Sequence, residues 1–334
     1  MKISTFTKAI AGGVALSAVM AGAAFADPAL IYDLGGKFDK SFNESAYNGA
    51  EAWKADGGKN YVDLELQNDA QREQALRRFA SQGSNPIVVM SFMWESVLGP
   101  LAGEFPDTNF VVIDATVDAP NVQSIRFDEH TGSFLVGALA AMKSESDVFG
   151  FVGGMDVPLI HRFYCGYAQG VRAVNPDARL IENYTGTTPA AWNDPVTAGE
   201  LAKAAIDQGA EVVFAAAGGS GLGVLQTMAD AGKYSIGVDS NQNYLHPGSV
   251  LTSMEKRVGN AVALSFDQAG DDATFQPGKI DLGLEGDFVG YSLDEHNKDL
   301  ITEDMIAQVE ELKAKILSGE IVVHDYETDS SCPV

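Results

Sequence analysis

Short apolar runs alternate with helical patterns along nearly the whole chain, and this alternation constrains the fold more than any other feature. The runs 86–91 (PIVVMS), 109–114 (NFVVID) and 211–217 (EVVFAAA) are almost continuously apolar, as strands buried on both faces of a parallel sheet are. Segments with helical spacing, such as 129–143 and 158–175, separate the strands. The repeated strand–helix order predicts an α/β fold with parallel, doubly wound, Rossmann-like sheets.

The strands and helices divide near residue 127 into two series of comparable size, with no low-complexity linker between them. Two such lobes predict a hinge and a ligand cleft between the lobes that opens and closes. We also expect a final strand at 321–324. The expected limits are 27–127 plus about 256–285 for the first lobe, 128–255 plus about 286–325 for the second lobe, and 326–334 for a C-terminal tail.

The first 26 residues have the pattern of a secretory signal peptide. Lys2 and Lys8 form a basic segment before an apolar stretch at 9–23. Ala24-Phe25-Ala26 after it is an A-x-A cleavage site. The stretch is too short to span a bilayer, and the first residue after the cut is Asp27 rather than the cysteine of a lipoprotein. The pattern therefore predicts removal of residues 1–26 and release of the chain into a bacterial periplasm without a lipid anchor.

The chain is strongly acidic, and this limits its partners. Its formal net charge is −24, and removal of Lys2 and Lys8 with the signal peptide takes the charge to −26. A surface of this sign repels phosphate backbones and anionic headgroups. We therefore expect neither nucleic acid nor a membrane surface as a partner.

A group of chemically useful residues lies where the first predicted strand meets the first helix. Asp33 ends the strand, and Ser41 with Glu44 forms a capping box that begins the helix. Phe42 and Asn43 follow in the first turn, so an acid, an aromatic ring and an amide meet at the carboxyl end of a strand. Open α/β sheets bind ligands at that edge. The alternative is that Phe42 only packs the helix against the sheet.

The second lobe offers a matching set. Trp192 precedes Asp194, the expected N-cap of a helix, so aromatic rings at helix starts on opposite lobes could enclose a flat ring between them. Stacking of this kind is worth about 1–3 kcal/mol for a nucleobase. Lys256, if buried near Asp239, could donate to a ligand hydroxyl whose own proton the aspartate accepts. The alternatives are a tryptophan packed on its own lobe and a solvated lysine.

A glycine run at 217–223 nearly matches a dinucleotide-binding fingerprint, because it follows a strand, opens a helix and precedes Asp239 by about twenty residues. Val224 occupies the third glycine position, and the run lies deep in the second lobe. We therefore expect no dinucleotide cofactor. The glycines of this run, Gly219 and Gly221 among them, instead allow the backbone to approach a smaller ligand.

The chain shows no constellation for catalysis or metal binding. Its five histidines lack metal-ligand spacing, and no G-x-S-x-G elbow is present. We expect neither an enzyme nor a metal or cofactor site. Cys165 and Cys332 lie in a chain expected to reach an oxidising compartment, so they form either one disulfide or two free thiols.

Six parts of the chain carry a familiar pattern: KSFNESAYNG, GFVGGMDVPLIHRFYCGYAQGVRAVNP, the Trp192-Asn193-Asp194 loop, AAAGGSGLGV, GVDSNQ and LTSMEKRV. Together these segments resemble the basic membrane protein family of ABC-transporter substrate-binding proteins, which includes purine nucleoside receptor lipoproteins. The resemblance implies a type I periplasmic binding fold with two lobes joined by three crossings, and a monomer that delivers a purine nucleoside to an inner-membrane ABC permease. The absence of a lipobox cysteine departs from the lipoprotein members.

The resemblance also implies roles for individual residues. Phe42 and Trp192 would stack on the base, with Trp192 standing where the family commonly has phenylalanine. Asp33, Asp239 and Lys256 would hold the ribose. Asn241 replaces an acid in the family pattern G-V-D-x-D-Q. The remaining candidates are Gly219 and Gly221 for backbone contact, Ser91 and Asp128 for the base edge, and Asn43 and Phe92 beside them.

Three alternative functions stay open at this level. A free purine base or a sugar could replace the nucleoside as ligand, and a free base would not need Asp239 and Lys256. An exported nucleoside hydrolase is disfavoured because no plausible nucleophile or metal site is present. A ligand sensor for a membrane receptor kinase would have the same binding residues as a transport component.

Overall fold

The computed structural model describes residues 27–57, 60–269 and 274–334. The predicted signal peptide lies outside the described residues. Among the helices that are described, none has the length and apolar character needed to cross a membrane.

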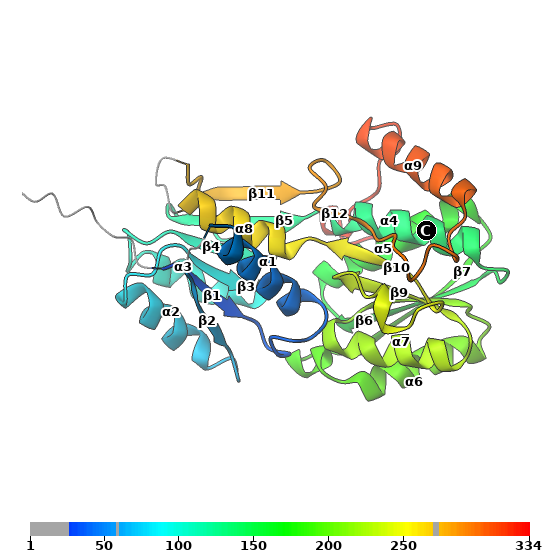
Figure 1. The fold of residues 1–334 in the computed structure, drawn as a ribbon, viewed down its shortest axis with the longest axis horizontal. Helices are drawn as coiled ribbons and strands as arrows, with labels where there is room; N and C mark the ends of the chain where they lie inside the picture. Colours follow the sequence, from blue (N-terminus) through cyan, green and yellow to red (C-terminus); the bar gives the residue numbers. More distant parts are fainter. Residues whose placement is uncertain (1–26, 58–59, 270–273) are drawn as a thin grey trace, which may run out of the picture.

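The described chain forms two α/β lobes, each built on a six-stranded sheet (Figure 1). All neighbouring strands of the first sheet are parallel, and in the second sheet only the edge strand β12 runs antiparallel to its neighbour. This confirms the predicted fold class. The first sheet has the order β11 (Gly278–Leu282), β5 (Val122–Phe127), β4 (Phe110–Ile113), β3 (Ile87–Met90), β1 (Ala29–Tyr32), β2 (Val62–Glu65). The second has the order β12 (Val289–Tyr291), β10 (Val250–Lys256), β9 (Tyr234–Asp239), β8 (Val212–Ala216), β6 (Val148–Met155), β7 (Arg179–Gly186).

Helices cover the faces of both sheets, as the apolar strands require (Figure 1). Around the first sheet lie α1 (Phe42–Gly57), α2 (Gln71–Ser81), α3 (Glu95–Ala102) and α8 (Val258–Ala269). Around the second lie α4 (Glu129–Lys143), α5 (Pro158–Val174), α6 (Pro195–Asp207), α7 (Gly221–Asp230) and α9 (Glu303–Leu317). Short 3₁₀ turns occur at η1 (Phe92–Trp94), η2 (Pro189–Trp192), η3 (Gly218–Ser220), η4 (Asn243–Leu245) and η5 (Tyr326–Thr328).

Within the described residues the chain passes between the two lobes three times. It leaves the first lobe between β5 and α4, returns between β10 and α8, and leaves again between β11 and β12. These crossings lie side by side and place Asp128, Glu129 and Lys256 at the junction of the lobes. The junction is the hinge about which such a fold opens.

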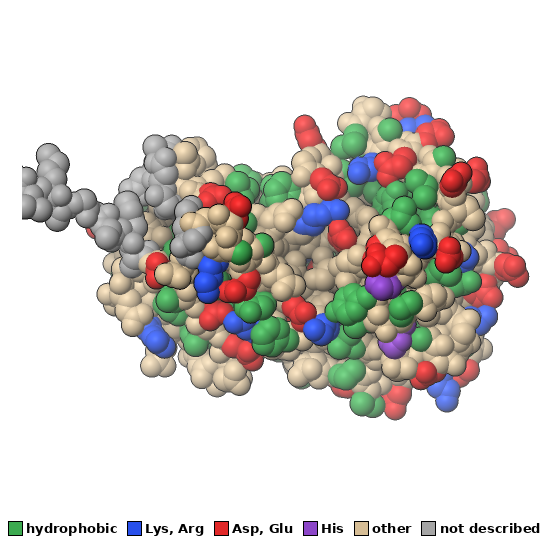
Figure 2. Space-filling view, viewed as in Figure 1, with side chains coloured by type: hydrophobic (Ala, Val, Ile, Leu, Met, Phe, Trp, Pro, Cys, Tyr) green, Lys and Arg blue, Asp and Glu red, His purple; other side chains and the backbone are tan. Residues whose placement is uncertain are grey.

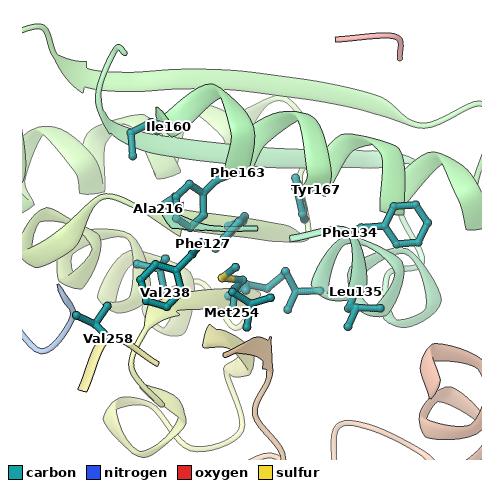
Figure 3. Close-up of a cluster of buried hydrophobic side chains, with 14 of the residues drawn as sticks. Phe127, Phe134, Leu135, Ile160, Phe163, Tyr167, Ala216, Val238, Met254 and Val258 are labelled. Atoms are coloured by element: carbon teal, nitrogen blue, oxygen red, sulfur yellow. The ribbon is translucent and has the colours of Figure 1, made fainter. Parts of the chain in front are cut away.

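The largest buried apolar cluster runs through this junction rather than staying within one lobe. It joins Leu30 of the first sheet, through Phe127 on β5, to Phe214 and Val238 of the second sheet. The close-up in Figure 3 shows Phe127 and Phe163 facing Val238 and Ala216 in this cluster. The same packing therefore supports the hinge and the wall of any cleft above it.

Helices α4 and α5 are in direct backbone contact. A Cβ atom added at Gly137 would lie 2.2 Å from the carbonyl oxygen of Tyr167, and one added at Gly170 would lie 1.9 Å from that of Phe134. Gly166 makes the same kind of approach to His130. Glycine in a helix interior lowers stability by about 1 kcal/mol relative to alanine. At these positions it permits the close contact between the two helix backbones, which a larger residue would prevent.

Two features of the predicted secondary structure are wrong. Residues 321–324 form no strand, because the backbone of His324 bonds instead to the side chain of Gln169 on α5, at 2.8 Å and 2.9 Å. Conversely, β11 was not predicted as a strand. Its sequence GKIDL alternates charged and apolar residues at a sheet edge and lacks the apolar run of a central strand.

The C-terminal tail is attached to α5. Cys165 and Cys332 form a disulfide with their Cα atoms 5.5 Å apart. Asp325 accepts two hydrogen bonds from Arg162, at 2.8 Å and 2.9 Å, and Tyr326 stacks on the ring of His161. The tail is thereby held against the second lobe close to the hinge.

Candidate functional site

A cavity lies between the two lobes and is lined by residues of both. Most of its polar wall comes from the carboxyl ends of strands, where an α/β sheet is expected to bind a ligand. The face in Figure 2 shows acidic side chains spread over both lobes, in keeping with the net charge. The lining residues are Asp33, Leu34, Gly35, Asp39, Phe42, Asn43, Ser91, Phe92, Asp114, Leu159, Ile160, Phe163, Trp192, Ala216, Gly218, Gly219, Val238, Asp239 and Lys256.

The two aromatic residues singled out in the sequence both line this cavity, from opposite lobes. Phe42 is the first residue of α1, and the ammonium of Lys256 lies 5.2 Å from the centre of its ring. Trp192 ends η2 in the second lobe. Each lobe therefore contributes an aromatic ring to the cavity lining, and α5 adds the apolar side chains of Leu159, Ile160 and Phe163.

The start of α1 differs from the predicted capping box. Asp39, not Ser41, caps the helix, because its carboxylate accepts from the backbone N–H groups of Asn43 at 3.0 Å and Glu44 at 3.1 Å. Burial raises the pKa of Asp39 to about 6, although these backbone donors oppose the shift. The hydroxyl of Ser41 donates instead to Asp239 of the opposite lobe. A partner that is distant in sequence has displaced the local cap.

A buried group of charges lies at the hinge end of the cavity. The ammonium of Lys256 lies 2.6 Å from Asp114 Oδ2 and 3.0 Å from Glu129 Oε1, and all three side chains are almost fully buried. Burial alone would lower the pKa of Lys256, but Asp114, Glu129 and Asp239 outweigh it and raise that pKa. Burial raises the pKa of Asp239 to about 7, with Lys256 opposing. The lysine is therefore a firmly charged donor, whereas Asp239 is close to changing its protonation state near neutral pH.

Three polar residues of the wall have backbone conformations that are rare for residues other than glycine. The φ angles are +106° for Ser91, +70° for Asp114 and +64° for Asp239, each at or just past the end of a strand. Such conformations cost of order 1–3 kcal/mol and concentrate at ligand sites. They turn these side chains toward the cavity instead of continuing the pleat of the strand.

Asp114 is a site residue that the sequence analysis missed. Its Oδ1 is buried and has no hydrogen-bond partner among the described residues, while its Oδ2 is paired with Lys256. The signal for it was available, because it ends the apolar run NFVVID just as Asp33 follows the first strand. An unpaired carboxylate oxygen on a cavity wall is an acceptor for a ligand donor.

Asp33 and Asn43 also line the cavity, and both already have protein partners. Asp33 Oδ1 accepts from Arg72 at 2.6 Å, and burial raises the pKa of Asp33 while Arg72 opposes the shift. The amide of Asn43 bonds to the backbone N–H and carbonyl of Asp33 and to the carbonyl of Gly36. Asn43 therefore shapes the loop, and Arg72 is a second residue that no local pattern identified.

Two predicted ligand residues, Asp128 and Gly221, do not line the cavity. Asp128 lies where β5 turns into α4, and its side chain points into a separate surface pocket beside Asp281 and Glu285. Gly221 begins α7 and packs against Ala215 of β8, so Gly218 and Gly219 present the backbone to the cavity in its place. The other predicted residues, Asp33, Phe42, Asn43, Ser91, Phe92, Trp192, Gly219, Asp239 and Lys256, all line it.

Comparison with known proteins agrees with this architecture. "Basic membrane protein A" of Borreliella burgdorferi is 29% identical over 292 residues, which cover 85% of this chain and 84% of that protein. An uncharacterized lipoprotein of Pyrococcus furiosus is 29% identical over 325 residues, covering 88% of this chain and 80% of its own length. The crystal structure of an ABC transporter solute-binding protein from Aeropyrum pernix superposes with a TM-score of 0.81 at 28% identity, covering 90% of this chain and 95% of the other.

A family model described as ABC transporter substrate-binding protein, PnrA-like, matches residues 29–327. The match covers both lobes, the three crossings and every residue that lines the cavity. It confirms the resemblance seen in the sequence, and with it the type I periplasmic binding fold and the general role of binding a small molecule for an ABC permease. The chain belongs to the Bmp family of ABC transporter substrate-binding proteins.

Proposed function

We propose that the ligand of this protein is a purine nucleoside, which it carries to the permease of an ABC importer. The observation that carries the proposal is the shared cavity of Phe42 and Trp192, which come from opposite lobes, with Asp114, Asp239 and Lys256 at one end. Two aromatic faces suit a flat base. A cluster of acceptors beside a buried ammonium suits a sugar that offers several hydroxyl groups.

In this proposal the base lies between the two rings and the ribose lies toward the hinge. Lys256 donates to a ribose oxygen, while Asp239 and the unpaired Oδ1 of Asp114 accept from ribose hydroxyls. A ligand held in this way contacts both lobes. It therefore binds the closed arrangement more tightly than the open one, and this differential affinity drives closure.

We further propose that the protein works as a monomer in the periplasm, without a lipid anchor and without catalysing a reaction on its ligand. The residue right after the predicted cleavage site is Asp27 rather than the cysteine to which a lipid would be attached, and this supports the lack of an anchor, although two Pyrococcus relatives are named as lipoproteins. Fractionation of cells that express the full chain tests the location. An anchored protein would remain with the membranes, and a free one would appear in the osmotic-shock fluid.

The first experiment is thermal unfolding of the mature protein, refolded to remove bound ligand, against a panel of nucleosides, free bases and sugars. A ligand at 100 times its dissociation constant adds about 2.7 kcal/mol to the free energy of unfolding, which raises the melting temperature measurably. We expect a shift with guanosine, adenosine or inosine and none with ribose. A shift with a sugar alone would leave the family intact and overturn the ligand.

Two further measurements separate the alternatives. Asp239→Asn and Lys256→Met are expected to weaken nucleoside binding and to leave any binding of a free base unchanged, because a base lacks the ribose that these residues hold. Incubation of the protein with nucleoside, followed by chromatography for free base, tests for a hydrolase. Release of base in proportion to protein would show catalysis and would contradict the proposal.

A further inference from the structure

The indole of Trp192 lies against a strand of its own lobe, at a position that has no side chain. A Cβ atom added at Gly154 would lie 2.1 Å from Cζ3, 2.4 Å from Cε3 and 2.9 Å from Cη2 of Trp192. These distances are far inside van der Waals contact. The six-membered ring of the indole therefore occupies the space that any side chain at position 154 would fill.

The backbone at Gly154 has little freedom to move away. Gly154 lies on β6, whose pairing with β7 continues past it to Met155, whereas the pairing with β8 ends at Gly153. The hydroxyl of Thr185 on β7 also donates to the carbonyl of Gly154 at 3.1 Å. The neighbouring residues Gly153 and Met155 pair with Tyr184 and Gly186 on β7. A methyl group at position 154 would therefore displace the indole rather than the strand.

The backbone at Trp192 is held as firmly. The carbonyl of Ala191 accepts from the hydroxyls of Ser220 at 2.7 Å and Thr185 at 2.8 Å, and the hydroxyl of Ser220 also accepts from the N–H of Asp194. The backbone is thus held on both sides of Trp192. The side chain can respond to a methyl group at position 154 only by rotating its indole ring. A Cβ atom added at Gly219 would lie 3.2 Å from the backbone carbonyl oxygen of Trp192, so the backbone of Trp192 is closely packed on that side as well.

The other lobe also approaches Trp192 through a glycine. A Cβ added at Gly35, in the loop after β1, would lie 3.7 Å from Cβ of Trp192, and one at Gly218 would lie 3.6 Å from its Cε3. Gly35 and Gly218 both line the cavity, so these two contacts lie where the indole borders it. The open direction for a displaced ring is the cavity that Phe42 bounds from the first lobe.

We propose that Gly154 is a positioning residue that determines the specificity of the site. By having no side chain it lets the indole lie back against β6, and this sets the width of the slot between Trp192 and Phe42 into which a flat base fits. The inference rests on the proposed function, since it assumes that the base lies between these rings. It adds that tryptophan at position 192 is tolerated only with glycine at position 154.

The test is a cycle of three variants, Gly154→Ala, Trp192→Phe and the double variant, with affinities for guanosine, adenosine and inosine measured by calorimetry. A phenyl ring does not extend to the Cζ3 and Cη2 positions, so it avoids the added methyl. We expect Gly154→Ala to weaken binding about 5- to 150-fold, the equivalent of losing one stacking contact. Trp192→Phe should weaken binding only a few-fold, and the double variant should match Trp192→Phe.

The matched control is Gly186→Ala, whose added Cβ would meet Cβ of Ala191 at an ordinary 3.5 Å. It adds a methyl to the adjacent strand and should leave affinity unchanged. If Gly154→Ala fails to fold, the double variant still tests the proposal. Folding and nucleoside binding that are restored by phenylalanine at position 192 support it. A wild-type affinity in Gly154→Ala, or a double variant that binds no better than Gly154→Ala, overturns it. A wild-type protein that binds no nucleoside would instead overturn the proposed function.

Discussion

The hydroxyl of Ser41 in the first lobe donates a hydrogen bond to the carboxylate of Asp239 in the second. Two further bonds cross the cleft beside it, from Ser240 Oγ to the carbonyl of Ser41 at 3.0 Å and from Gln242 Nε2 to the carbonyl of Lys40 at 2.9 Å. We call these three bonds the interlobe latch. Because Asp239 also lines the cavity, the latch and the ligand share one carboxylate.

Loss of the Ser41 hydroxyl should shift the lobes toward the open arrangement. Ser41→Ala removes a donor to a buried carboxylate, and a hydrogen bond to a charged group contributes about 1.5–3 kcal/mol. We expect a larger radius of gyration by small-angle X-ray scattering and weaker nucleoside binding. Ser265→Ala, which removes a buried hydroxyl bond within α8, is the control and should change neither quantity. Identical scattering from Ser41→Ala and the wild type would show that the bond between Ser41 and Asp239 does not contribute to closure.

The raised pKa of Asp239 predicts how stability depends on pH. Between its ordinary value near 4 and its folded value of about 7, the folded state keeps a proton that the unfolded state has lost. This group therefore makes the protein less stable as pH rises through that window, by at most about 1.4 kcal/mol per pH unit. Asp239→Asn removes this contribution, so its stability relative to wild type should improve from pH 4 to pH 7.

Urea unfolding at pH 4, 5.5 and 7 measures this difference. Asp39, with a pKa raised to about 6, acts in the same direction, and its charge is one cause of the raised pKa of Asp239, so the comparison measures Asp239 together with its interaction with Asp39. Parallel stability curves for Asp239→Asn and wild type would mean that folding does not change the pKa of Asp239.

Trp192→Ala should reduce nucleoside affinity by the value of one stacking contact, about 1–3 kcal/mol. The comparison variant is Phe38→Ala, since the ring of Phe38 is 62% exposed and packs edge-on against Tyr47 outside the cavity. Calorimetry with a single nucleoside is sufficient. Unchanged affinity in Trp192→Ala would remove the aromatic pair from the binding scheme.

The disulfide should stabilise the protein without taking part in binding. Cys165 and Cys332 close a loop of 167 residues, and native disulfides commonly contribute 2–4 kcal/mol. Cys332→Ser should lower the free energy of unfolding by about that amount and leave nucleoside affinity unchanged. A reducing agent should lower wild-type stability similarly and should not affect the variant. A change in affinity would instead mean that the tail is coupled to the cavity through Arg162 and Glu129.

Features that depend on local sequence were predictable, and those that depend on distant partners were not. The limits of α4 and β9 agree with their apolar patterns, and Asp194 caps α6 as expected. Ser41 had every local property of a cap, yet its hydroxyl bonds to Asp239, 198 positions away. Arg72 lies within a charged helix pattern, and only the folded chain pairs it with Asp33.

The site was therefore partly predictable for the same reason. Residues that end apolar strands can be read from the sequence, and Asp33, Ser91 and Asp239 all line the cavity. Asp128 also ends a strand, but the chain crosses to the other lobe there and its side chain faces away. The contribution of α5, through Ile160 and its neighbours, depends on how the helix packs, which the pattern of one segment does not determine.

The contact between α4 and α5 has a mechanical consequence. α4 begins at the first crossing, and α5 carries Ile160 and Phe163 into the cavity wall. Where Gly137, Gly166 and Gly170 bring the two backbones together, no layer of side chains lies between them that could deform by shear. The two helices should therefore move as one rigid body. A rotation of the backbone at residues 127–129 would then turn the part of the cavity wall on α5 through the same angle. Closure of the two lobes is then a hinge motion, and its amplitude is set by the rotation at residues 127–129.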